Sequence, residues 1–293
     1  MSLSAADLRG FFDRHKAAVV AELSAVRGSS PREAGAFMII SALEQIGTIG
    51  GGALEYMVID RARQVLRSGE AGDTLDIPLG PEIGQCCGGR VDVALKRVTP
   101  ELAAALVGRV EAAAAARPHV FVFGAGHVGR ALARALLLLP LRVHVVDTRR
   151  EELAGLPEDV DTIAAAMPEA VVRTAPSGSS YVILTHDHAL DFLIAAEALE
   201  RRDAPYVGMV GSATKRARFR SWYGAEGYDL AALERLVLPI GGHAYPAGLG
   251  DKRPEVIAAL AAAEIIVHAG RREASDIKAE PATETKSGAV IGH

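Results

Sequence analysis

The stretch Val120-Phe-Val-Phe-Gly-Ala-Gly-His-Val-Gly129 decides the fold of the second half of the chain. A short apolar run leads into a loop with three spaced glycines, and the loop opens a helical pattern. Gly124 permits a tight turn, Gly126 lets a pyrophosphate approach the backbone, and Gly129 allows a helix to pack closely on a strand. This order predicts a Rossmann fold with a nucleotide or phosphate at the helix N-terminus.

An acidic residue, Asp147, follows at the end of the next apolar run, 142–146. At that place a carboxylate could accept hydrogen bonds from the hydroxyl groups of a ribose. The alternative is that the fold persists without a nucleotide, because a fold does not fix a function.

Apolar runs and helical patterns alternate from residue 118 to residue 270. The runs that we expect to form strands are 120–123, 142–146, 162–165, 181–184 and 206–210. The helical patterns are 128–139, 189–200, 214–223 and 253–269. Alternation of this kind indicates an α/β fold, a doubly wound parallel sheet with crossover helices. We therefore expect a Rossmann-like domain at 118–270.

The first 112 residues follow a different pattern, and an alanine-rich segment at 112–118 marks the boundary. Apolar spacing predicts strands at 17–26 and 90–98, with a helix from Gly52 to about Gly69 between them. We expect an N-terminal mixed α+β domain at 1–112. The polar end of the chain, 271–293, shows little periodicity from Glu273 onward and predicts a disordered tail.

Composition excludes several classes of function. The net charge is −4 and aromatic residues make up 5% of the chain, so neither a basic field nor stacking platforms for nucleic acid are expected. The longest apolar run, 135–141, is too short to span a bilayer. The adjacent Cys86 and Cys87 would form a strained disulfide, so free thiols and a cytoplasmic location are expected.

Three glycine-rich loops distinguish the N-terminal half: 27–32, 47–55 and 84–90. The triple glycine Gly50–Gly52 before a helix could form an anion-binding nest of backbone N–H groups. Cys86 and Cys87 lie in a glycine-rich turn, where Arg90 could lower a thiol pKa and favour soft metal binding. The alternative is that both cysteines are small buried apolar residues and that the glycines only mark loops.

Polar residues also gather directly after the apolar run 181–184. His186, Asp187, His188 and Asp191 would lie at the carboxyl end of a strand, where open α/β sheets bind ligands. They could transfer protons or bind a metal. The alternative is that Asp187 or His188 begins the helix 189–200 as its N-cap. A metal held by both histidines is disfavoured, because residues two apart diverge on a strand.

Two cations follow the run 206–210. Ser212 or Thr214 would cap a helix whose first turn contains Lys215 and Arg216. Cations are electrostatically unfavourable at a helix N-terminus, so they indicate a bound anion such as phosphate. The alternative is that both side chains point to solvent.

Eight stretches of the chain, in this order, resemble the blocks of the xanthine dehydrogenase accessory (XdhC/CoxI) family: SSPREAGAFMI, GTIGGGALEY, GQCCGGRVDV, VFVFGAGHVGRALA, VDTR, THDHALD, VGMVGSATKR and LPIG. The resemblance implies an accessory domain followed by a Rossmann domain. It also implies a protein that binds molybdenum cofactor (molybdopterin), holds it for sulfuration and delivers it to a molybdenum hydroxylase. No redox turnover of its own is expected.

The resemblance also implies roles for particular residues. Cys87 matches the cysteine of the family's CGG block and is a possible molybdenum contact, while Cys86 is an additional thiol. The segment 42–45 departs from the family's usual turn. The candidate cofactor-binding residues are Cys86, Cys87, Gly50, Gly51, Gly52, Glu55, Gln85, Arg90, Gly124, Gly126, Gly129, Asp147, His186, Asp187, Lys215 and Arg216.

The expected partners are the molybdenum-binding subunit of xanthine dehydrogenase, a cysteine desulfurase and a second copy of the chain in a dimer. An alternative function is an NAD(P)-dependent oxidoreductase with His186 or His188 as the proton donor. Another is a non-catalytic protein that senses a nucleotide. The cysteine–glycine loops favour the cofactor carrier, because a simple dehydrogenase does not need them.

Overall fold

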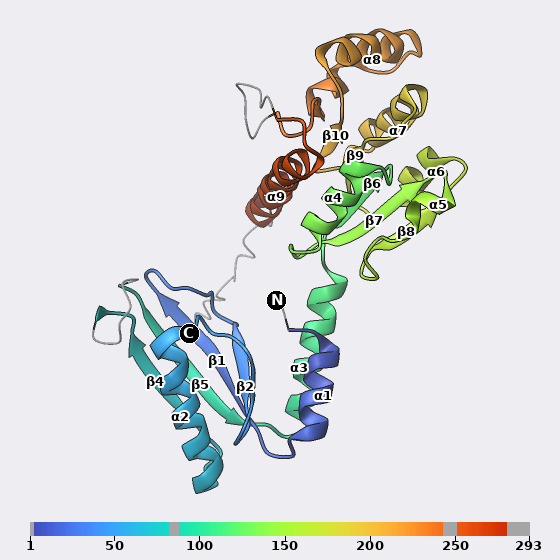
Figure 1. The fold of residues 1–293 in the computed structure, drawn as a ribbon. Helices are drawn as coiled ribbons and strands as arrows, with labels where there is room; N and C mark the ends of the chain where they lie inside the picture. Colours follow the sequence, from blue (N-terminus) through green and yellow to red (C-terminus); the bar gives the residue numbers. More distant parts are fainter. Residues whose placement is uncertain (1–2, 82–87, 243–250, 280–293) are drawn as a thin grey trace, which may run out of the picture. The chain divides into compact units, whose positions relative to one another are not determined.

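The computed structural model describes residues 3–81, 88–242 and 251–279, and of these it describes 270–279 only as backbone. The chain divides into two compact units, Met1–Ala116 and Arg117–His293. Figure 1 shows the helices and strands of both units. The division lies inside the segment 112–118, where the sequence changes its pattern.

The first unit is a five-stranded antiparallel sheet with helices on both faces. Its strands have the order β3-β2-β1-β5-β4. In chain order its elements are α1 (Ala5–Arg14), β1 (Val19–Arg27), β2 (Phe37–Ile40), β3 (Gln45–Gly47), α2 (Gly52–Ser68), β4 (Gly72–Pro78), β5 (Arg90–Arg97) and α3 (Pro100–Ala115). The sequence predicts β1, α2 and β5 to within about two residues, but it does not single out α1, β2, β3 or β4.

The central strand β1 is buried on both faces. Val19, Ala21 and Leu23 belong to the core beneath α2, whereas Val20 belongs to the core beneath α1 and α3. This division follows from the two-residue period of a strand. In Figure 1, α2 lies on one side of the sheet and the pair α1 and α3 lies on the other. The unit is therefore a three-layer α/β/α arrangement.

The second unit contains the doubly wound sheet. In chain order its elements are β6 (His119–Phe123), α4 (His127–Leu136), β7 (Arg142–Asp147), α5 (Arg150–Leu153), β8 (Asp161–Ala164), α6 (Pro168–Thr174), β9 (Ser180–Ile183), α7 (His188–Glu200), β10 (Val207–Met209), α8 (Ala213–Ala225), a 3-10 helix η2 (Leu230–Arg235), β11 (Leu236–Val237) and α9 (Pro254–Ala279). The five strands that the sequence predicts are all present, and β11 is added at one edge.

The strand order is β11-β10-β9-β6-β7-β8, and all pairs are parallel. If the six strands are numbered 1 to 6 along the chain, starting with β6, and the sheet is read from β8 to β11, the order is 3-2-1-4-5-6, which is that of a Rossmann fold. The topological switch point lies between β6 and β9. Helices α4 and α9 pack on one face of the sheet, and α6, α7 and α8 pack on the other. The prediction of a doubly wound parallel sheet is confirmed.

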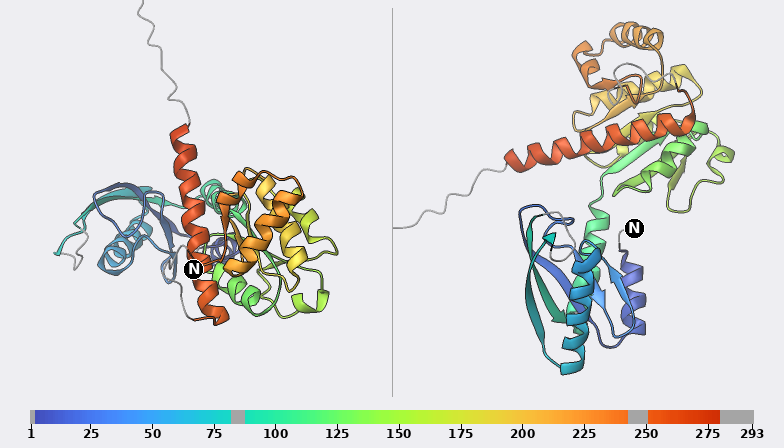
Figure 2. Two further views of the ribbon diagram at one scale, coloured as in Figure 1. Left: turned by 90° about the horizontal axis from the view of Figure 1, so that it is seen from above. Right: turned by 60° about the vertical axis from the view of Figure 1, so that its left-hand side comes forward.

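The last helix, α9, is longer than the sequence predicts. Its buried residues from Ala258 to Ile265 pack against α4, where small alanine side chains permit close approach. The helix continues to Ala279 and so extends into the tail, 271–293, for which the sequence predicts disorder. Figure 2 shows α9 in red from two sides. The remainder of the predicted tail lies outside the described residues.

Every helix of the described segments is too short or too polar to cross a membrane.

Candidate functional site

The triple glycine of the first unit begins helix α2. Gly50, Gly51 and Gly52 have φ angles of 135°, 79° and 65°, a region that side chains with a Cβ rarely adopt. This backbone directs N–H groups at the carboxylate of Glu55. Its Oε1 accepts hydrogen bonds from the Thr48 hydroxyl at 2.5 Å, the Ile49 N–H at 3.0 Å and the Gly51 N–H at 2.9 Å.

The nest that the sequence predicts is therefore present, but the anion in it belongs to the chain itself. Burial raises the pKa of Glu55, while the hydrogen bonds from Thr48, Ile49 and Gly51 together outweigh burial and hold the pKa below its usual value. Glu55 is thus ionised, and its carboxylate holds the loop 48–51 through these hydrogen bonds, an arrangement called here the Glu55 clamp. An external phosphate in the same nest stays a prediction, and it would have to use other N–H groups of the helix N-terminus.

Two of the glycine-rich loops of the N-terminal half contact each other, and the described end of the third, 88–90, contacts one of them. A Cβ added at Gly50 would lie 3.2 Å from the ring of Pro31, so loop 47–52 touches loop 27–32. A Cβ at Gly89 would lie 2.0 Å from the Ser29 carbonyl oxygen, so loop 27–32 also touches the end of segment 84–90. Sequence reasoning identified each loop separately, and the fold brings them together.

The thiols predicted as cofactor contacts lie outside the described residues, as does Gln85. The chain is described again from Gly88, whose N–H donates to the Leu79 carbonyl at 2.9 Å. This bond extends the pairing of β4 with β5 beyond the strand ends. In the sequence, both cysteines fall between these two strands.

Arg90, which the sequence pairs with a phosphate or a thiolate, has a carboxylate partner. Its Nε donates to Asp76 Oδ1 at 2.5 Å, and the guanidinium group of Arg27 donates to Asp92 Oδ1 at 2.6 Å. Hydrogen bonding to Asp76 raises the pKa of Arg90, and the group is half exposed. Among the described residues Arg90 donates only through Nε, to Asp76, so its other N–H groups remain for a second anion.

The glycines of the loop 124–129 in the second unit have different reasons for being glycine. Gly124 has a φ of 113°, and a Cβ there would lie 2.5 Å from the Leu184 carbonyl oxygen. A Cβ at Gly129 would lie 1.9 Å from the Gly124 carbonyl oxygen. A Cβ added at Gly126 would meet no atom of the described residues within 4 Å other than its neighbours in the chain. The first and last glycines are required by the packing of the chain, and only Gly126 faces space that a ligand could occupy.

Asp147 is buried and directed at this loop. Its Oδ2 accepts from the Ala125 N–H at 2.8 Å and from the Arg149 guanidinium at 3.1 Å. Its Oδ1 accepts from the Arg149 N–H at 3.0 Å and from Arg149 Nε at 3.1 Å. Burial raises the pKa of Asp147, but these hydrogen bonds outweigh it and keep the pKa low. A carboxylate offers about four acceptor positions, so a ribose hydroxyl would require Arg149 to move. The ribose role stays a prediction.

The polar residues after β9 divide into two groups. Asp187 is the N-cap of α7, and its Oδ1 accepts from the Ala189 N–H at 2.8 Å, which confirms the structural alternative for this residue. His186 and His188 are exposed. Among the described residues, no three or more His, Cys, Asp or Glu side chains are grouped so that they could hold a metal ion.

Asp191 forms a buried ion pair with Lys215. The ammonium group donates to Asp191 Oδ2 and, at 2.9 Å, to the Val210 carbonyl oxygen. Asp191 is fully buried, and its Oδ1 accepts from the Thr185 N–H and hydroxyl at 3.0 and 2.8 Å. The first turn of α8 is thus compatible with a cation because a carboxylate of the same unit neutralises it.

Arg216 also binds within the unit. Its guanidinium group donates to the carbonyl oxygen of Leu238 at 2.6 and 3.0 Å. The sequence offered two alternatives for Lys215 and Arg216, a bound anion or a solvent-facing position. The structure shows a third, in which both side chains attach α8 to neighbouring segments. Ser212, not Thr214, is the N-cap of the helix.

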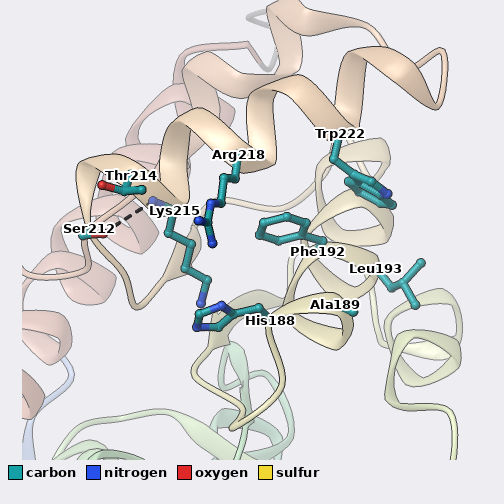
Figure 3. A pocket seen from close by; sticks show the side chains of 9 residues that line it. All are labelled: His188, Ala189, Phe192, Leu193, Ser212, Thr214, Lys215, Arg218 and Trp222. Atoms are coloured by element: carbon teal, nitrogen blue, oxygen red, sulfur yellow. Dashed lines mark hydrogen bonds between the residues drawn. The ribbon is translucent and has the colours of Figure 1, made fainter.

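A pocket of about 520 Å³ opens between α7 and α8 (Figure 3). Its lining includes His188, Phe192 and Leu193 from α7, and Lys215, Arg218 and Trp222 from α8. The sequence reasoning singled out His188 and Lys215 but missed the aromatic residues and Arg218. The spacing of four residues between His188 and Phe192, and between Arg218 and Trp222, was the signal, because residues four apart share a helix face.

The fold and the two sets of loops define a class: a two-unit protein whose second unit is a Rossmann-type domain with a glycine loop at its switch point. Residues 120–265 match the family model described as the XdhC Rossmann domain, and residues 12–78 match the model of the XdhC and CoxI family. The chain belongs to this family.

Two relatives extend the comparison. The uncharacterised protein YqeB of Escherichia coli K12 is 25% identical over 257 residues, which cover 84% of this chain and 42% of that protein. The chain thus spans about two fifths of that relative's length. A crystal structure of a Bacillus halodurans protein described as a xanthine dehydrogenase superposes with a TM-score of 0.73 at 19% identity. It covers 92% of this chain and 97% of that one, and this likeness concerns the fold.

Proposed function

We propose that the protein binds molybdenum cofactor, holds it for sulfuration, and inserts it into apo xanthine dehydrogenase or a related molybdenum hydroxylase. The observation behind the proposal is membership of the XdhC and CoxI family across both units, at 12–78 and 120–265. In this function the cofactor is cargo, and the protein itself performs no redox turnover.

The arrangement of the first unit supports a binding role. Loops 27–32 and 47–52 contact each other, and Gly89, two residues after Cys87 in the sequence, contacts the first of these loops. Glycine backbone lets a bulky ligand approach closely, and a thiolate is a soft ligand that suits molybdenum. Arg90 lies three residues after Cys87 and keeps N–H groups for the phosphate of a pterin.

The second unit could contribute at its own glycine loop. The open space at Gly126 and the N-terminus of α4 suit a phosphate, either of the pterin or of a nucleotide. The oxidoreductase alternative has less support, because Arg149 occupies the acceptors of Asp147 that a dinucleotide ribose would use. We therefore keep the carrier function as the conclusion.

The test uses Cys86→Ala and Cys87→Ala, made separately and checked for fold by circular dichroism. After loading with molybdenum cofactor, bound molybdenum is measured by elemental analysis and bound pterin by its fluorescence after oxidation. We expect Cys87→Ala to lose most of the retained cofactor and Cys86→Ala to lose less, because neighbouring residues on an extended segment point to opposite sides.

Two results would change the conclusion. If both variants retain cofactor like the wild type, the thiols have no binding role. If the wild-type protein retains neither molybdenum nor pterin, and instead changes NADH absorbance with a substrate, the carrier function is wrong and the oxidoreductase takes its place.

A further inference from the structure

The pocket between α7 and α8 lies where an open α/β sheet offers a binding site. Helix α7 follows β9 and helix α8 follows β10, so both helices begin at the carboxyl ends of neighbouring parallel strands. Ligands of such sheets bind outside these strand ends. The volume of about 520 Å³ falls within the usual range for small-molecule sites.

The floor of the pocket is held rigidly. Lys215 lines the pocket and is paired with the fully buried Asp191, whose other oxygen accepts two hydrogen bonds from Thr185. Of the three ammonium N–H groups, one donates to Asp191 Oδ2 and one to the Val210 carbonyl oxygen. No other described residue accepts the third, which remains for a ligand and is held in position by the buried pair.

A second cation, Arg218, lines the pocket from the next turn of α8. It forms no hydrogen bond or ion pair with any residue that the structure describes, and Figure 3 shows its side chain directed from α8 into the pocket near His188 and Lys215. No carboxylate lines the pocket among the described residues. A guanidinium group in this setting is suited to a phosphate or carboxylate, which it can bind through two N–H groups.

The other end of the pocket is aromatic. Phe192 and Trp222 lie one helical turn beyond His188 and Arg218, respectively, and their ring centroids are 5.6 Å apart. Both rings pack against Phe219 and are only partly buried, so part of each ring stays exposed. A flat ring could stack on either of them while an attached anion reaches Arg218, because the two groups are one turn, about 5 Å, apart along the helix.

We propose that this pocket is a binding site for a phosphorylated flat heterocycle, such as a nucleotide or a pterin phosphate. The phosphate binds to Arg218 and the free N–H of Lys215, and the ring stacks against Phe192 or Trp222. No residue of the glycine loop 124–129 is among the residues that line this pocket. The inference goes beyond the proposed function and does not depend on it.

The chain supplies its own probe for this site, because Trp222 is its single tryptophan. The full-length protein is titrated with GMP, guanosine, inorganic phosphate and a monophosphorylated pterin. Quenching of tryptophan fluorescence reports occupancy, and titration calorimetry checks the pterin, which absorbs in the emission range. We expect GMP, the pterin phosphate or both to bind more tightly than guanosine and more tightly than inorganic phosphate.

The matched variants are Arg218→Ala and Arg220→Ala. Both arginines are exposed on α8, but only Arg218 lines the pocket. We expect Arg218→Ala to weaken binding of the phosphorylated ligand about tenfold or more, to the level of guanosine, because a charge-assisted contact is lost. Arg220→Ala should bind like the wild type, and Phe192→Leu should weaken GMP more than inorganic phosphate.

Three results would overturn the proposal: no phosphorylated heterocycle quenches Trp222, guanosine binds as tightly as GMP, or Arg220→Ala weakens binding as much as Arg218→Ala. The relative affinities for GMP and the pterin phosphate show whether the site prefers a nucleotide or a phosphorylated pterin. Cofactor retention, measured in parallel, separates the two proposals. Failure of the carrier function would appear as a wild type that retains no cofactor, or as a Cys87→Ala protein that retains as much as the wild type. Neither result depends on how Arg218→Ala binds GMP or the pterin phosphate.

Discussion

At the scale of single residues, the three glycines of loop 124–129 differ in what requires them. Gly124 and Gly129 are fixed by backbone atoms of the chain, because an added Cβ would overlap a carbonyl oxygen at 2.5 and 1.9 Å. Gly126 has an extended backbone, with φ of −69°, and open space around it. A glycine that the packing does not require is the best candidate for contact with a ligand.

We therefore predict opposite effects for two substitutions in this loop. Gly126→Val should leave the melting temperature nearly unchanged but weaken nucleotide or cofactor binding about tenfold or more, because its side chain fills the space that a phosphate needs. Gly129→Ala, the matched change, should destabilise the protein by about 1–3 kcal/mol through overpacking. Thermal unfolding and titration calorimetry measure the two effects. Equal ligand affinity of Gly126→Val and the wild type would rule out this loop as a phosphate site.

At the scale of elements, the beginning of α2 depends on an internal anion. Helix N-termini have unpaired N–H groups and a positive dipole end, and Glu55 supplies a carboxylate to the loop that precedes its own helix. A similar internal balance holds at α8, where Asp191 neutralises a first-turn lysine. The N–H groups before α2 and the ammonium group of Lys215 in α8 each have a carboxylate partner in their own unit. A charge at a helix end is therefore weak evidence for a ligand until its partners are known.

The Glu55 clamp predicts a dependence of stability on pH. The folded pKa of Glu55 is lowered, so its stabilising contribution is complete above the unfolded pKa of about 4.3 and is lost as the pH falls through the folded value. Glu55→Gln should reduce the free energy of unfolding by about 1–3 kcal/mol at neutral pH. The difference from the wild type should shrink in acid.

Denaturant unfolding between neutral and acidic pH measures this difference. The control is Glu33→Gln, which changes an exposed carboxylate in the same unit and should alter stability little at any pH. A Glu55→Gln protein as stable as the wild type at neutral pH would show that the carboxylate does not hold the loop.

At the scale of the whole molecule, the proposed carrier must release what it binds. A hand-off requires moderate affinity for the cofactor and a short-lived complex with the apo-enzyme, and transient complexes tend to have small interfaces. The net charge of −4 provides no strong field to steer a partner. Recognition must then depend on local surface features.

Deleting the gene should leave the client molybdenum hydroxylase present as protein but short of active cofactor. Molybdenum content and specific activity of the purified client measure this, and immunoblotting measures its amount. Expression of the wild-type chain should restore activity, whereas expression of Cys87→Ala should restore less. Normal molybdenum content and activity in the deletion strain would contradict the carrier function.

The sequence by itself determined the architecture of the second unit. The pattern of strand, glycine loop, helix and terminal acid is local, and each part of it follows from backbone sterics and from the apolar period of the segment. It also predicted β1, α2 and β5 of the first unit. The short strands β2 and β3, of four and three residues, were missed because so few residues show no clear period.

The tertiary structure alone decided the partners of the polar groups. Glu55, Asp147 and Lys215 each have a side chain that could meet a ligand, and in the structure each one binds to the chain itself. Two further features became visible only in the fold: the contact between Phe192 and Trp222 in the α7–α8 pocket, and the contacts of Gly50 and Gly89 with loop 27–32. The physical reason is the same in each case. Periodicity and propensity act between near neighbours in the sequence, whereas hydrogen bonds, ion pairs and cavities join residues that only the packing of helices and strands brings within reach.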